Sequence, residues 1–251
     1  MIDEWLERLT SCEETSALHG AFFEAMAHFG FNNVFYSARF LVPLPSSLTQ
    51  GHAVTVTNLP PDIARQFTDS GVISQSLWAD WVFNNSGEIS SRELLASASD
   101  AAPTQMLRIA RRLDLVAAQI LSLRDRELRS HGALLLNPHV GAEHEDVARL
   151  WSIGGRQVRV LARVFHLRMA TMRRDTRKVL TPRQREVLEW RSAGKTIAEI
   201  GTILGVTPAT VEKHMRLARE ALGAETTAQA ILKAHVAQEL FPDHDRQNPF
   251  A

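Results

Sequence analysis

The side chains with the clearest chemical pattern lie on one predicted helix near the end of the chain, residues 208–222. Its apolar residues recur at three- and four-residue spacing and must face a core: Val211, Met215, Ala218 and Leu222. The opposite face is polar and carries Ala209, Glu212, Lys213, Arg216 and, to one side, Arg219 and Glu220. A carboxylate can accept from cytosine, a guanidinium can donate to guanine, and a small alanine allows close approach. The pattern indicates a helix face that can read base edges in the major groove of DNA.

Other side chains near this face are suited to the phosphate backbone, because they offer a positive charge or a hydroxyl. They are Lys195, Thr196, Thr210, Lys213 and Arg219. Residues 173–239 hold twelve Lys and Arg against eight Asp and Glu, although the whole chain holds 28 of each, so positive charge gathers toward this end. A basic helix face is often only a solvated surface. The inference of DNA binding therefore also needs the elements that position this face.

Four short helices are predicted over residues 180–240, each with signals at its ends. Three of them begin with T-x-x-[EQ], a pattern in which the threonine caps a backbone amide and the third residue reaches back: 181–184, 196–199 and 226–229. Pro182 and Pro208 suit first helical positions, and Gly194, Gly205 and Gly223 suit left-handed helix ends. The second and third helices, 196–204 and 208–222, are joined by only three residues, which is typical of a helix-turn-helix.

The preceding part of the chain has a mixed α/β pattern. Helices are predicted at 3–29, 61–67 and 73–83, and strands at 33–42, 52–57, 116–123 and 129–137. A long amphipathic helix follows over 141–172, which either only covers the sheet or also pairs with a second subunit. The fold class is therefore α+β. We expect a first domain over 1–172, a charged linker over 173–179, an all-α domain over 180–240 and a tail over 241–251.

Several function classes lack their residues here. Cys12 is the only cysteine, and His131, His139 and His144 lack metal spacing and a carboxylate partner, so neither a disulfide, a metal nor another cofactor is expected. No glycine-rich phosphate loop, nucleophile elbow or catalytic carboxylate pair indicates an enzyme. The chain contains no long apolar run and no export signal, so we expect a cytoplasmic protein without membrane contact.

The C-terminal segment resembles the DNA-binding domain of LuxR-type regulators. The resemblance is carried by residues 180–190, 193–200 and 203–206 and by Thr210, Val211, His214, Gln229 and Ala230. It implies a four-helix fold that binds DNA, with Glu186 and His214 in structural roles. Leu217 and Ala221 stand where many relatives have Asn and Lys, which places the operator preference in doubt more than DNA binding itself.

Residues 54–63, continuing to Ser91, resemble the autoinducer-binding domain of quorum-sensing LuxR regulators, whose fold is an α/β/α sandwich. In receptors for acyl-homoserine lactones, this region supplies a Tyr and a Trp to ligand carbonyls and an Asp to the ligand amide. A gap-free placement puts Leu59, Ile63, Phe67 and Ser76 at the Tyr, Trp, second Tyr and Asp positions. Ser91 falls at a second Trp and Ala118 near a glycine. A four-residue slip would instead place Asp80 as the acceptor.

These replacements predict that ordinary lactones are not bound. A buried ligand amide without its acceptor costs about 1 to 3 kcal/mol, and several such losses compound. The candidate pocket residues are mostly apolar: Phe35, Leu59, Ile63, Phe67, Gln75, Ser76, Trp78 and Trp81. Two interpretations remain, a filled core without ligand and a different, less polar ligand.

The sequence thus predicts a homodimeric LuxR-type transcriptional regulator that binds promoter DNA and does not respond to acyl-homoserine lactones. Dimerisation is expected because one helix-turn-helix makes too few base contacts for tight specific binding, and the 141–172 helix is the expected interface. The alternative is an interaction module that heterodimerises with a true lactone receptor and inhibits it.

Overall fold

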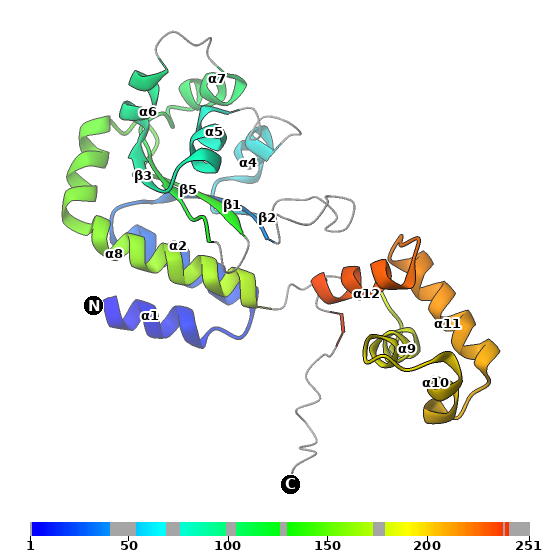
Figure 1. The fold of residues 1–251 in the computed structure, drawn as a ribbon. Coiled ribbons are helices and arrows are strands. Elements are labelled where there is room, and N and C mark those ends of the chain that lie inside the picture. Colours follow the sequence, from blue (N-terminus) through cyan, green and yellow to red (C-terminus); the bar gives the residue numbers. More distant parts are fainter. Residues whose placement is uncertain are drawn as a thin grey trace. The chain divides into compact units, whose positions relative to one another are not determined.

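The computed structural model describes residues 2–40, 54–68, 76–98, 104–125, 130–172, 179–237 and 239–240. These residues form two compact units, one on each side of residue 173 (Figure 1). The expected linker, apart from Val179, and the expected tail lie outside the described residues, as does Gln75. No helix in the described ranges is both long and apolar enough to cross a membrane.

The first unit is built on an antiparallel sheet with strand order β2-β1-β5-β4-β3. The strands are β1 (Asn33–Arg39), β2 (Val54–Thr57), β3 (Gly87–Ser90), β4 (Gln119–Ser122) and β5 (His131–Asn137). β1 and β5 pair along their full lengths, from Asn33 opposite Asn137 to Arg39 opposite His131. Both strands run as largely buried segments in the centre of the sheet, because helices cover both of its faces.

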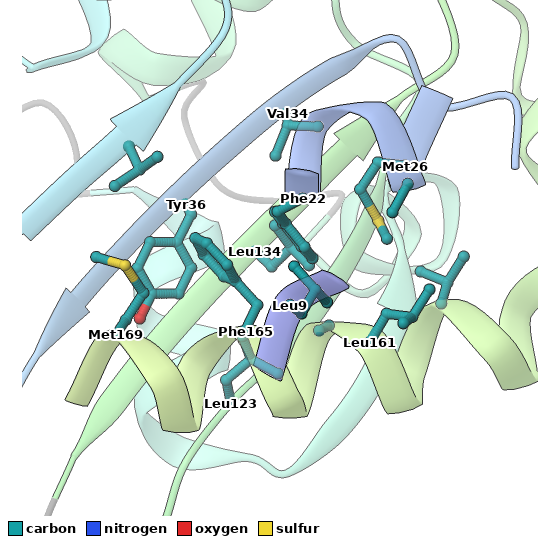
Figure 2. Packing of buried hydrophobic residues seen from close by; sticks show 14 of the residues in the cluster. Leu9, Phe22, Met26, Val34, Tyr36, Leu123, Leu134, Leu161, Phe165 and Met169 are labelled. Atoms are coloured by element: carbon teal, nitrogen blue, oxygen red, sulfur yellow. The ribbon is translucent and has the colours of Figure 1, made fainter. Parts of the chain in front are cut away.

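One face of the sheet packs against α1 (Ile2–Ser11), α2 (Thr15–His28) and α8 (His144–Thr171). Because side chains alternate along a strand, Val34 and Tyr36 of β1 point into this layer together with Leu134 of β5. Figure 2 shows these side chains meeting Phe22 of α2 and Phe165 of α8, whose rings stack with centroids 4.0 Å apart. All five side chains are fully buried, so this layer is the main core of the unit.

The other face of the sheet is covered by four short helices (Figure 1). They are α4 (Pro61–Thr68), α5 (Leu77–Asn84), α6 (Ser91–Ser97) and α7 (Gln105–Arg112). Phe35 of β1 points into this second layer, where it meets Phe67, Trp78 and Met106. Helices on both faces of the sheet make an α/β/α sandwich, as the sequence predicted.

Some predicted elements of the first unit differ from the structure. The expected helix 3–29 is two helices, because α1 ends at Ser11 and α2 begins at Thr15. The expected helix 73–83 begins at Leu77, because the buried Ser76 side chain caps it by accepting from Ala79 N at 3.0 Å. The sequence reading missed β3, α6 and α7, although Thr104 caps α7 and its buried residues follow helical spacing.

The second unit consists of α9 (Pro182–Ser192), α10 (Ile197–Leu204), α11 (Pro208–Ala221) and α12 (Thr227–Val236). One buried cluster joins α9, α10 and α11 through Val187, Ile200, Val211 and Met215, and a second joins α9, α11 and α12. The described part of this unit is all-α with four helices, in agreement with the sequence.

The predicted helix ends of the second unit are largely confirmed. Thr181 and Thr196 form reciprocal capping boxes with Gln184 and Glu199, and the three glycines have φ of +86°, +64° and +57° at residues 194, 205 and 223. The third box was wrong. Thr226 caps Gln229 N, but the Gln229 side chain accepts from Glu225 N at 2.7 Å instead of from Thr226.

Candidate DNA-recognition helix and sensor cavity

The predicted DNA-reading face is the exposed face of α11. Val211, Met215 and Ala218 are buried, and Ala209, Glu212, Lys213 and Arg216 are exposed on the other side. Neither Glu212 nor Lys213 has a hydrogen bond or ion pair within the described residues. Thr207 caps the helix by accepting from Thr210 N, and the two threonine hydroxyls lie 2.9 Å apart. The geometry leaves one anionic and one cationic side chain available at neighbouring positions.

Two arginines of α11 already have partners. Arg216 donates to the Glu220 carboxylate at 2.6 Å one turn further along the helix, and both side chains are more than half exposed. Arg219 is half-buried and donates to the Thr227 hydroxyl of α12 at 3.2 Å. An exposed ion pair contributes little to stability. Arg216 can therefore exchange Glu220 for a base edge at small cost.

Lys195 and Thr196 lie at the start of α10. The Thr196 hydroxyl donates to the Glu199 carboxylate at 2.8 Å, and Lys195 Nζ is 3.9 Å from the same carboxylate group. The backbone and side-chain hydrogen bonds from Thr196 lower the pKa of Glu199. The hydroxyl of Thr196 is thus engaged in capping, and the residue is exposed at the start of α10.

The turn between α10 and α11 depends on two glycines. Gly205 has φ +64°, which side-chain-bearing residues rarely adopt. Gly201 has a different reason, because a Cβ there would lie 2.8 Å from the backbone oxygen of Val206. That close approach accompanies the hydrogen bond from Val206 N to Gly201 O at 2.9 Å. The sequence identified Gly205 but not Gly201, whose constraint arises only once the turn has folded.

A buried carboxylate closes the second unit. Glu239 is 5% exposed, and its two oxygens accept from Val179 N at 3.0 Å and Leu180 N at 2.8 Å. The two ends of the described part of this unit are therefore held together directly. Sequence reasoning missed this residue because nothing local distinguishes it from a surface glutamate.

A small cavity of about 40 Å³ lies in the first unit, between the sheet and the layer of short helices. The described residues that line it are nine apolar residues and two asparagines: Asn33, Val34, Phe35, Leu59, Phe67, Trp78, Met106, Leu115, Ala118, Leu135 and Asn137. Four of the predicted pocket residues thus line it, namely Phe35, Leu59, Phe67 and Trp78. Ile63 and Trp81 are partly buried in the surrounding cluster without lining the cavity.

The polar positions of the cavity differ from those expected. Ser76 is buried as the cap of α5 and does not line the cavity, and Asp80 is exposed on α5. Among the described residues, the polar ones that line the cavity are Asn33 and Asn137, which the sequence analysis did not select. Asn33 Nδ2 donates to Asn137 Oδ1 at 2.9 Å, and Asn137 Nδ2 donates to the Ala117 carbonyl at 2.7 Å.

An α/β/α unit with an internal cavity, followed by a four-helix unit with a helix-turn-helix, is the architecture of a two-domain bacterial regulator. Comparison with known proteins agrees with this class. Residues 14–169 match the autoinducer binding domain family, and residues 178–234 match the bacterial regulatory proteins of the luxR family. The chain belongs to the LuxR-type family of quorum-sensing regulators.

Curated relatives match over short segments of the chain. The transcriptional activator protein BjaR1 of Bradyrhizobium diazoefficiens is 47% identical over 55 residues, which are 22% of this chain and 23% of that protein. The transcriptional activator protein AhyR of Aeromonas hydrophila is 36% identical over 77 residues, 31% of this chain and 30% of its own. These matches therefore span less than a third of either relative.

Solved structures share the fold over most of the chain. Escherichia coli SdiA has a TM-score of 0.53 at 18% identity and covers 96% of this chain and 98% of its own. SdiA in complex with octanoyl-rac-glycerol gives a TM-score of 0.51 at 17% identity and covers 94% of this chain and 93% of its own. At this identity the likeness concerns the fold.

Proposed function

We propose that the protein is a DNA-binding transcriptional regulator that acts without acyl-homoserine lactones. The observation that supports DNA binding is the exposed face of α11, where Glu212, Lys213 and Arg216 stand opposite a buried face within an intact helix-turn-helix. Glu212 and Arg216 are one turn apart and suited to base edges, whereas Lys195, Lys213 and Thr210 are suited to phosphates.

Insensitivity to lactones follows from the chemistry of the cavity. At the positions where the resemblance places lactone-binding side chains, Leu59 and Phe67 present only hydrocarbon, and Ser76 is used as a helix cap. None of the described lining residues carries a carboxylate to accept from a ligand amide. The cavity, at about 40 Å³, is also far smaller than the roughly 300 Å³ at which small-molecule pockets begin.

The proposed regulator acts as a homodimer through α8. Three large aliphatic residues of α8 stay exposed at seven-residue intervals: Ile153 at 74%, Val160 at 41% and Leu167 at 47%. Residues seven apart lie on one helix face, so the three form a continuous stripe. A two-fold axis near Val160 would set Ile153 of each subunit against Leu167 of the other, which covers the whole stripe.

Gel retardation with purified full-length protein tests the proposal. We expect retention of a specific promoter fragment by protein prepared without ligand, at moderate salt, with the same apparent Kd after addition of N-octanoyl-homoserine lactone or octanoyl-rac-glycerol. Heat-denatured protein and a scrambled fragment are the controls. A lactone-dependent gain in affinity would contradict the lactone-independent part of the proposal. Absence of any specific retention would contradict the regulator itself and favour a module that pairs with a lactone receptor.

A further inference from the structure

We infer that Lys233 of α12 is a positioning residue for DNA recognition, because it fixes the C-terminal end of α11. The inference rests on the proposed function, in which the exposed face of α11 reads base edges. It gives a role to a half-buried lysine that the sequence analysis did not select. Lys233 lies on a different helix from the reading face, so its effect on DNA binding is exerted through the helix that it holds.

The ammonium group of Lys233 donates to two backbone carbonyls at the end of α11. Lys233 Nζ lies 3.1 Å from the oxygen of Leu222 and 2.7 Å from the oxygen of Gly223. The last carbonyls of a helix lack partners within the helix and carry the negative end of its dipole. A cation at this position therefore stabilises the helix end, and a Lys or Arg in the last turn can supply it.

The arginine in the last turn of α11 is directed elsewhere. Arg219 is half-buried and donates to the Thr227 hydroxyl at the start of α12, at 3.2 Å. One cation thus reaches from α11 to the start of α12, and Lys233 reaches back from α12 to the end of α11. Leu222 and Ala230 also pack in the buried cluster that the two helices share. The end of α11 is therefore held by charged hydrogen bonds as well as by apolar packing.

The N-terminal end of α11 is fixed independently of α12. Thr207 caps this end, and the amide of Val206 donates to the carbonyl of Gly201 in α10 at 2.9 Å. Glu212 and Arg216 lie between the two fixed ends. Side chains that read bases must be held to within about 0.5 Å of their working geometry. A helix released at its C-terminal end should therefore lose sequence selectivity, whereas attraction to phosphates depends little on exact placement.

Fluorescence anisotropy of the full-length protein tests the inference, with a duplex that the protein selects from a random library and a scrambled duplex. Lys233→Met removes the charge and keeps most of the side-chain length. We expect it to weaken binding of the selected duplex roughly tenfold. Binding of the scrambled duplex should change less than about twofold, and the slope of log affinity against log salt concentration should not change. Lys233→Arg should restore most of the lost affinity, because a guanidinium can donate to the same carbonyls.

Lys213→Met is the matched control, because it removes the same charge from the exposed face of α11. It should weaken binding of both duplexes about equally and lower the salt slope. Unchanged binding of the selected duplex by Lys233→Met, or a fall in its salt slope like that of Lys213→Met, would overturn the inference. If the unaltered protein selects no duplex, the proposed function fails and the inference fails with it.

Thermal unfolding followed by circular dichroism shows whether each variant is folded at the assay temperature. If Lys233→Met is not folded there, Lys233→Gln takes its place, because its amide can still donate to a carbonyl. We expect Lys233→Gln to show the same loss of selectivity in weaker form. Full selectivity in a folded Lys233→Gln that no longer stabilises α11 would contradict the positioning role.

Discussion

Arg216 is the side chain on α11 that is best suited to reading guanine. Its ion pair with Glu220 is exposed and therefore weak, so Arg216 can exchange Glu220 for another partner. We expect Arg216→Ala to weaken specific DNA binding by about 1 to 3 kcal/mol, with a relaxed preference at one base-pair position. Binding to non-specific DNA should change much less. Quantitative gel retardation with an operator and its single-base variants measures both effects. Glu220→Ala is the control, since it frees Arg216 and should not weaken specific binding.

His166 gives the first unit a predicted dependence on pH. It is 3% exposed, lies 2.7 Å from the Tyr36 hydroxyl and 2.8 Å from the Ser130 hydroxyl, and burial lowers its pKa to about 4. Because the unfolded chain gains a proton near pH 6.5 and the folded chain does not, stability is full above that pH and falls as the pH drops toward 4. The expected loss between pH 7 and pH 5 is about 2 kcal/mol.

Urea unfolding at the two pH values, followed by tryptophan fluorescence, measures this loss, because four of the five tryptophans belong to the first unit. His166→Gln should remove most of the pH dependence. His19→Gln is the comparison, since burial also lowers the pKa of His19, which is less buried. If the pH dependence of stability disappears in His19→Gln and persists in His166→Gln, it belongs to His19, and the prediction for His166 is wrong.

Helix α8 has one face in the core and a second face whose aliphatic stripe is the proposed dimer interface. Val160→Arg would place a charge in the centre of the stripe, next to the exposed Arg156 and Arg163. We expect the dimer Kd to rise at least tenfold, about 1.4 kcal/mol. Sedimentation equilibrium at micromolar concentration measures it. Val140→Arg is the matched control, since Val140 is 58% exposed and lies outside α8. A monomeric unaltered protein would contradict the proposed dimer.

The turn of the helix-turn-helix gives a prediction for α10 and α11 together. Gly201→Ala would press a methyl group against the Val206 carbonyl, which is backbone and cannot rotate away. We expect a loss of roughly 1 to 3 kcal/mol in unfolding free energy of the second unit, as for overpacked cores, and weaker DNA binding. Trp190 fluorescence reports on this unit. Gly194→Ala is the comparison, because its Cβ would meet no atom within 4 Å, although its φ of +86° also carries strain.

An element could be predicted when the residues that determine it lie close to it in the sequence. The two helices of the helix-turn-helix were predicted to within a residue, because Thr196 and Gly205 act on their immediate neighbours. β3 was missed because its four residues are only half-buried and gain their identity from pairing with β4. The Asn33–Asn137 pair was missed because the two residues are 104 positions apart and meet only through the β1–β5 register.

The molecule as a whole carries equal numbers of acidic and basic residues, so its affinity for DNA must come from local charge. Phosphate contacts release counterions, which makes affinity fall with salt. We expect Lys213→Ala to weaken binding to all sequences about equally. The slope of log affinity against log salt concentration should fall by about one per site. Fluorescence anisotropy across a series of salt concentrations measures the slope. An unchanged slope would show that Lys213 makes no phosphate contact.

Glu239 joins the two ends of the DNA-binding unit, with its carboxylate on the amides of Val179 and Leu180. Whatever precedes residue 179 and whatever follows residue 240 is therefore attached at one place on that unit. The unit has the form of a cassette with a single attachment point. Fusions at either end should leave its fold intact, whereas truncation before residue 239 leaves the amides of Val179 and Leu180 without this acceptor.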